Sequence, residues 1–81
     1  MAQTILTRFH GPTNTRGSLV TAKCWGGKKT VPYNYKLNAD ANHKAAADAL
    51  ITDLKERTGI DWTIVAYGCV PDDTGYAFII Q

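Results

Sequence analysis

The segment GPTNTRGS, residues 11–18, contains the groups from which phosphate-binding loops are made: glycines, hydroxyl side chains and an arginine. A P-loop needs four residues between its glycines, a lysine directly after the second glycine, and a helix after the loop. Here five residues separate Gly11 from Gly17, no lysine follows, and the next segment is typical of a strand. The sequence therefore argues against a nucleotide-binding loop.

Two interpretations of this segment remain open. It can be a structural turn, because Asn14 tolerates the left-handed conformation and Thr13 and Thr15 can bond to the nearby backbone. It can instead be a partner-binding loop, in which Arg16 offers its forked donor to a carboxylate or a phosphate beside the conformationally free Gly17. Asn14 and Arg16 are therefore candidate contact residues.

The remaining reactive side chains do not form a catalytic pattern. His10 ends the first expected strand, and His43 lies near the start of the expected helix, on its apolar side. The sequence places no serine, cysteine or acid beside either histidine to form a triad. Asp72 and Asp73 can in principle bind a metal, but within PDDTG they are typical turn formers. We expect no enzymatic activity, no metal and no cofactor.

The sequence favours a cytoplasmic protein. Its first ten residues, MAQTILTRFH, lack the cationic start and the long apolar core of a signal peptide, and no uncharged apolar run is as long as a membrane span. Cys24 and Cys69 are both expected in strands, reduced, and without the CxxC spacing of a zinc site. We expect no membrane contact.

The net charge of +2 conceals two unlike halves. Residues 1–38 contain six Lys and Arg and no acid, whereas residues 39–81 contain three Lys and Arg and all seven acids. Such a one-sided field can steer an anionic partner toward one face of a protein. The alternative is a solvated surface that is merely uneven.

The basic half also contains aromatic residues, and together they are the candidate binding set. Lysines beside aromatics on a sheet can contact phosphates and stack bases, although no RNP-type aromatic motif is visible. Lysines at a sheet edge also prevent edge-to-edge aggregation, which is the structural alternative. With Asn14, the set comprises Arg8, Arg16, Lys23, Trp25, Lys28, Lys29, Tyr33, Tyr35 and Lys36. We favour Arg16, Lys28 and Lys29 as contacts, with Trp25 or Tyr33 as the aromatic anchor.

These residues must be positioned by a small set of strands. Alternating or apolar runs predict strands over residues 3–10, 18–25, 28–37, 61–70 and 76–81. Gly26-Gly27 is typical of a hairpin turn, and Pro32 makes the third strand an edge or a bulged strand. In the second strand we expect Val20, Ala22 and Cys24 to face the core, because Lys23 then points to water.

One helix is expected, with Asn38 or Asp40 as its N-cap and Gly59 just past its C-terminus. Its apolar face repeats at helical spacing through His43, Ala46, Ala47, Leu50, Ile51 and Leu54. The order β-β-β-α-β-β predicts an α+β fold. We expect a single small domain, residues 1–81, in which one helix packs on one face of a mostly antiparallel sheet.

Four patches, in the order GPTNTRGS, VPY, NHKAAADAL and GYAF, resemble a group of very short, largely uncharacterised bacteriophage and prophage accessory proteins. The resemblance implies a phage setting, but no activity and no residue role carries over with it. Phage proteins of this size often bind a host machine stoichiometrically, as anti-CRISPR proteins do. A net charge of +2 argues against an acidic DNA mimic.

Together these features predict a non-enzymatic, phage-encoded binding protein in the bacterial cytoplasm. We expect it to inhibit a host defence or nucleic-acid-processing complex, in the manner of an anti-CRISPR, with a host protein or ribonucleoprotein complex as its partner. The alternative is a small nucleic-acid-binding module that uses the basic N-terminal hairpins. A homodimer is compatible with both, since an edge strand and a small core gain from pairing.

Overall fold

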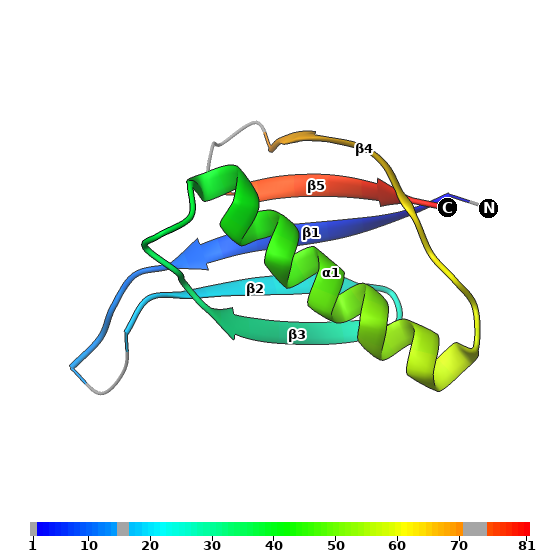
Figure 1. The fold of residues 1–81 in the computed structure, drawn as a ribbon, viewed down its shortest axis with the longest axis horizontal. Coiled ribbons are helices and arrows are strands. Elements are labelled where there is room, and N and C mark those ends of the chain that lie inside the picture. The colour runs from blue at the N-terminus through cyan, green and yellow to red at the C-terminus, as the bar shows by residue number, and fades with distance from the viewer. Residues whose placement is uncertain (1, 15–16, 71–74) are drawn as a thin grey trace.

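The computed structural model describes residues 2–14, 17–70 and 75–81, and shows one sheet with one helix across it (Figure 1). The elements are β1 (Gln3–His10), β2 (Leu19–Cys24), β3 (Gly27–Pro32), α1 (Ala39–Thr58), β4 (Ile64–Cys69) and β5 (Gly75–Ile80). The predicted α+β class and the order β-β-β-α-β-β are confirmed.

The sheet has five strands in the order β3-β2-β1-β5-β4, and every neighbouring pair is antiparallel. The first and last strands therefore lie side by side, with Gln3 opposite Ile80 and Ile5 opposite Phe78. β3 and β4 are the two edges. Pro32 ends β3 at one of these edges, as its missing N–H predicted.

The β2–β3 turn differs by one residue from the prediction. Cys24 pairs with Gly27, so the turn residues are Trp25 and Gly26, and Gly27 belongs to β3 with a φ of 149°. Arg57, in the last turn of α1, contacts this turn of the chain. The Arg57 guanidinium donates to the Gly26 carbonyl at 2.7 Å, and a Cβ on Gly27 would lie 2.8 Å from the same group.

Three expected strands are longer than the observed ones, and β2 is shorter by one residue at each end. β3 stops at Pro32, so Tyr33 and Tyr35 lie in the connection to α1, and β4 begins at Ile64 instead of residue 61. Tyr33 still donates its backbone N–H to the Ser18 carbonyl at 2.9 Å. The pairing of the chain therefore continues past the proline for one residue without forming a longer strand.

The core lies between α1 and one face of the sheet. The helix contributes the predicted apolar face, His43 to Leu54. All of its six residues are buried except Ile51, which is half-buried. From the sheet come Ile5, Val20, Ala22, Phe78 and Ile80, each with 0% exposure. Val20 and Ala22 face the helix and Lys23 faces away, as predicted for β2. Ala46 and Ala47 keep the helix close to the strands, since they extend no further than a methyl group.

Both helix ends are capped as predicted. The Asn38 side chain accepts from the Ala41 N–H at 2.8 Å, and Gly59 takes the left-handed conformation while donating to the Lys55 carbonyl. The sequence did not reveal the role of Asn42. Its buried amide accepts from the Asn34 N–H at 2.7 Å and donates to three backbone carbonyls, which fixes the connection before the helix.

α1 does not cover the sheet evenly. It packs mainly on β3, β2 and β1 and touches β5 less, so that β4 lies away from it at the far edge (Figure 1). The opposite face of the sheet has no helix in the described part of the chain. The fold thus leaves one whole face and one flank of the sheet uncovered.

The close approach of β5 to β1 can be tested at Gly75. A Cβ on Gly75 would collide with the backbone carbonyl of Thr7, whereas a Cβ on Gly68 would meet nothing within 4 Å. We expect Gly75→Ala to destabilise the fold by about 3 kcal/mol or more and Gly68→Ala to change stability by less than about 1 kcal/mol. Urea denaturation of the two variants measures this, and equal losses would contradict the close approach.

Candidate functional site

The first candidate surface is the side of the sheet opposite α1, which we call the open face. Along β1, Ile5 and Thr7 are buried under the helix, so Leu6, Arg8 and His10 point the other way. The strand register sets Arg8 opposite Thr21 and Leu6 opposite Lys23. It also sets Lys23 opposite Lys28 in β3.

These side chains surround a shallow hollow of about 300 Å³. Its lining consists of Leu6, Thr7, Arg8, His10, Thr21, Lys23 and Lys28. The open face therefore brings together three of the predicted contact residues, Arg8, Lys23 and Lys28. It adds Leu6, whose side chain is 52% exposed, and His10, which sequence reasoning did not include. The alternation of β1 was the signal that would have found both.

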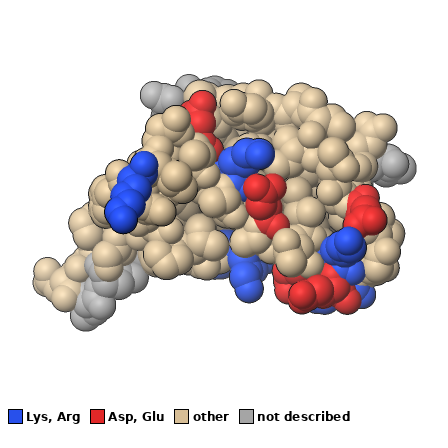
Figure 2. Space-filling view, viewed as in Figure 1, with Lys and Arg blue, Asp and Glu red and all other residues tan. Residues whose placement is uncertain are grey.

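The charged side chains of the open face are all cations, contributed by β1, β2 and β3, because none of the five strands contains Asp or Glu. Within the described chain, the acids lie on α1 and at Asp61. There they form ion pairs, Lys55 with Asp61 at 2.8 Å and Arg57 with Asp53 at 2.9 Å. Figure 2, which views the helix side, shows acidic and basic side chains mixed where α1 ends. The charge separation seen in the sequence is thus a separation between helix and strands.

The other predicted contact residues do not join this surface. Lys29 is opposite the buried Ala22, so it points to the helix side of the sheet, although it is exposed. Trp25 lies in the β2–β3 turn, 57% exposed, with its ring 5.2 Å from that of Trp62. Lys36 is exposed in the connection before α1.

The predicted binding loop is only partly described. Asn14 is exposed at its turn, whereas Arg16 lies outside the described residues, as does the Asp72-Asp73 pair. The prediction for Arg16 therefore stays a prediction. The structure groups Arg8, Lys23 and Lys28 on one face of the sheet. Lys29 points to the opposite face from Lys28, and the prediction that both are contact residues stays a prediction.

A second concave feature, the aromatic pocket, lies where β1 ends and α1 begins. It measures about 420 Å³ and is lined by Phe9, Tyr33, Tyr35, Ala39, His43, Gly75 and Tyr76. The ring centroids of Phe9 and Tyr33 are 5.1 Å apart at 81°, and those of Tyr33 and Tyr35 are 5.0 Å apart. The Tyr35 hydroxyl bonds to Ser18 Oγ at 2.6 Å, and the Tyr76 hydroxyl donates to Asp40. These bonds fix both rings.

His43 lines this pocket, and its side chain is hydrogen-bonded. Its Nδ1 lies 2.7 Å from the Thr7 hydroxyl, and both residues are buried. Burial lowers the pKa of His43 below its ordinary value of about 6.5, and the charge of Asp40 opposes this shift. The hydrogen bond to Asp40 raises the pKa of the Tyr76 hydroxyl, which stays protonated.

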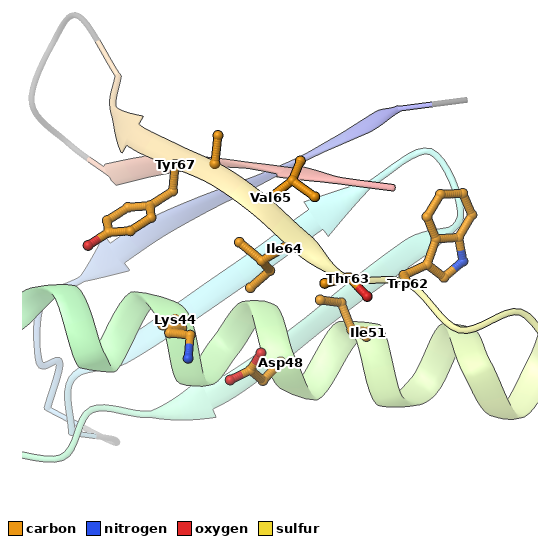
Figure 3. Close-up of a pocket in the computed structure, with 9 residues that line it drawn as sticks. Lys44, Asp48, Ile51, Trp62, Thr63, Ile64, Val65 and Tyr67 are labelled. Atoms are coloured by element: carbon orange, nitrogen blue, oxygen red, sulfur yellow. The ribbon is translucent and has the colours of Figure 1, made fainter.

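A third feature is a groove of about 720 Å³ between α1 and β4 (Figure 3). Lys44, Asp48 and Ile51 line it from the helix, and Ile64, Val65 and Tyr67 line it from the strand. Trp62 closes one end, and its indole Nε1 is buried with no hydrogen-bond partner in the described chain. The groove follows from the position of α1, which leaves β4 uncovered.

The described residues contain no group of three or more His, Cys, Asp and Glu side chains that could hold a metal ion. Cys24 and Cys69 are both free thiols, Cys24 half-buried and Cys69 exposed. No helix in the described ranges has the length and apolar character needed to cross a membrane.

Comparison of the chain with known families, with curated proteins and with solved structures gave no match.

The Thr7–His43 hydrogen bond should contribute measurably to stability. Thr7→Val keeps the shape of the side chain but removes the hydroxyl, which leaves a buried imidazole nitrogen without its partner. We expect a loss of about 1–3 kcal/mol in the free energy of unfolding. Thr4→Val, at an exposed threonine of the same strand, is the matched control and should stay within about 0.5 kcal/mol. Equal effects in chemical denaturation would show that the bond contributes nothing.

The lowered pKa of His43 predicts a pH dependence. As the pH falls below about 6.5, the unfolded chain takes up a proton on this imidazole while the folded chain resists it, so stability decreases. His43→Gln should flatten that decrease, whereas His10→Gln, which removes the imidazole on the open face, should preserve it. Thermal unfolding followed between about pH 7.5 and pH 5 gives the comparison. A wild-type curve flat across this range would refute the expectation.

Proposed function

We propose that this protein is a non-enzymatic binding protein that docks its open face on an acidic surface of a macromolecular partner. The observation that supports this most directly is the grouping of Arg8, Lys23 and Lys28 on a face whose strands contain no acid. Lys23 and Lys28 are directly opposite each other, and like charges in that arrangement are unfavourable. An anionic partner would relieve this repulsion.

A protein surface fits the open face better than single-stranded nucleic acid does. Leu6 lies opposite Lys23 on one side and Ala77 on the other and is 52% exposed, which gives an apolar point next to the cations. Protein interfaces combine an apolar centre with a polar rim, and arginine is frequent among their strongest contacts. Base stacking needs aromatic side chains, but the aromatics of β1 and β5 lie on the helix side. Tyr76 and Phe78 are opposite Thr7 and Ile5, and Phe9 is opposite the buried Val20.

The proposed partner is a host protein or ribonucleoprotein complex in bacterial defence or nucleic-acid processing. The support for this part is the resemblance of four sequence patches to phage accessory proteins. Stoichiometric inhibition requires only that the bound protein occupies a surface that the complex needs. The field of the open face would speed encounter with an acidic patch, and short-range contacts would then fix the orientation.

Adjacent lysines of β3 provide a sharp test. Lys28 lies on the open face and Lys29 on the helix side, so Lys28→Glu and Lys29→Glu make the same charge change on opposite faces. Tagged protein should recover a stoichiometric partner from the lysate of a bacterial host. We expect Lys28→Glu to weaken that complex about 10-fold or more and Lys29→Glu less than about 3-fold. Equal losses, or no partner recovered, would count against the open face.

Nucleic-acid binding is the second candidate, favoured by the same acid-free cations. Its signature is an affinity for DNA or RNA that falls steeply with salt, with a smaller salt dependence in Lys28→Glu than in Lys29→Glu. Fluorescence anisotropy with labelled single-stranded and double-stranded oligonucleotides measures this. Absent or salt-insensitive binding would eliminate the candidate.

A further inference from the structure

The two edges of the sheet are protected very differently. β3 contains Lys28, Lys29 and Pro32, all of which discourage another strand from pairing with an edge. β4 has the sequence IVAYGC, with no charged residue and no proline. Among the described residues it pairs only with β5, along one side. The structure therefore contains one guarded edge and one unguarded edge.

The side chains of β4 are also unusually apolar for a surface strand. Val65 and Tyr67 are each 56% exposed. α1 does not shield them, because the groove of about 720 Å³ separates the strand from the helix (Figure 3). From the helix, Lys44 and Asp48 face this groove, so one cation and one anion lie beside the strand and a second molecule would meet no net charge there.

The hydrogen-bond pattern shows which backbone groups of β4 point outward. Val70 donates to the Gly75 carbonyl at 3.0 Å, and Cys69 lies opposite Tyr76. Bonded and non-bonded pairs alternate along an antiparallel ladder. Gly68 is therefore bonded to β5, while the N–H and C=O groups of Tyr67 and Cys69 point toward the free edge.

We propose that β4 pairs antiparallel with β4 of a second copy of this chain, about a two-fold axis beside Tyr67. The outward backbone groups of Tyr67 then bond to those of Tyr67 in the other copy, which satisfies both strands by the same contact. A second copy is the chosen occupant because β4 is complementary to itself: it is uncharged, extended and free along one edge. The guarded edge, β3, is not complementary to itself, because it contains two lysines and a proline.

The proposed dimer has a definite architecture. Pairing of the two edges makes one continuous sheet, and a two-fold axis perpendicular to it places both open faces on the same side. Arg8, Lys23 and Lys28 of each copy then belong to a single cationic surface of doubled extent. Because one strand pair buries less area than a standard stable interface, we expect association in the micromolar range.

The first test compares two tyrosines. Tyr67→Lys places a charge at the centre of the proposed pairing, whereas Tyr35→Lys makes the same change at an exposed tyrosine outside the sheet. Light scattering coupled to size-exclusion chromatography, from about 1 μM to about 1 mM, should show a monomer–dimer equilibrium in wild type. We expect Tyr67→Lys to raise the dimer dissociation constant at least about 10-fold and Tyr35→Lys to leave it unchanged. A wild type that stays monomeric throughout overturns the proposal.

The second test examines the register and does not depend on Tyr67→Lys folding normally. In Tyr67→Cys the new thiols meet across the two-fold axis, within the Cα separation that a disulfide requires. A mild oxidant should convert this variant to a covalent dimer much faster than Tyr35→Cys, which contains the same native thiols. A dimer that forms without cross-linking at position 67 would place the interface elsewhere and overturn the proposal. Both tests are independent of any partner of the open face.

Discussion

The dominant constraint in this molecule is that a single helix must cover one face of a five-stranded sheet. An α-helix with its side chains is about 10 Å wide, and strands lie about 4.8 Å apart, so a single helix shields two to three strands. α1 lies over β3, β2 and β1, where Ala46 and Ala47 allow close contact, and leaves β4 outside its reach. The groove and the bare edge of β4 result from this mismatch in width, whereas the open face is left because the described chain has no second helix to cover it.

The polar residues under and around α1 hold it in that off-centre position. Asn42 and Asn38 fix its first turn to the preceding connection, and Arg57 ties its last turn to the β2–β3 turn. Between these ends, His43 bonds to Thr7 of the central strand β1. The helix is thus held by hydrogen bonds from its first two turns and from its last turn, and the bond of His43 joins it directly to β1. The acids that it contains remain remote from the open face.

Much of this arrangement was predictable from local sequence patterns. The helix, its caps, its apolar stripe and the inward face of β2 follow from spacing and from single residues such as Gly59. Strand order did not follow, because the pairing of β1 with β5 depends on contacts such as Ile5 with Phe78, which no local pattern encodes. The sequence indicated which cations are candidates for contacts, but it did not indicate which of them lie on the same face of the sheet. Separating Lys28 from Lys29 needs the register of β3 against β2, and the predicted turn was one residue away from the true one.

The position of β5 also has a consequence for how the chain acquires its structure. The sheet closes at its middle, where residues near one end of the sequence meet residues near the other. Contacts between such distant residues slow folding, since a long loop must be ordered first. During synthesis, β1, β2, β3 and α1 emerge before Phe78 and Ile80 exist, and β1 is temporarily a bare edge beside an incomplete core. The nascent chain is then at its most vulnerable to aggregation, and the final strand ends that interval when it inserts.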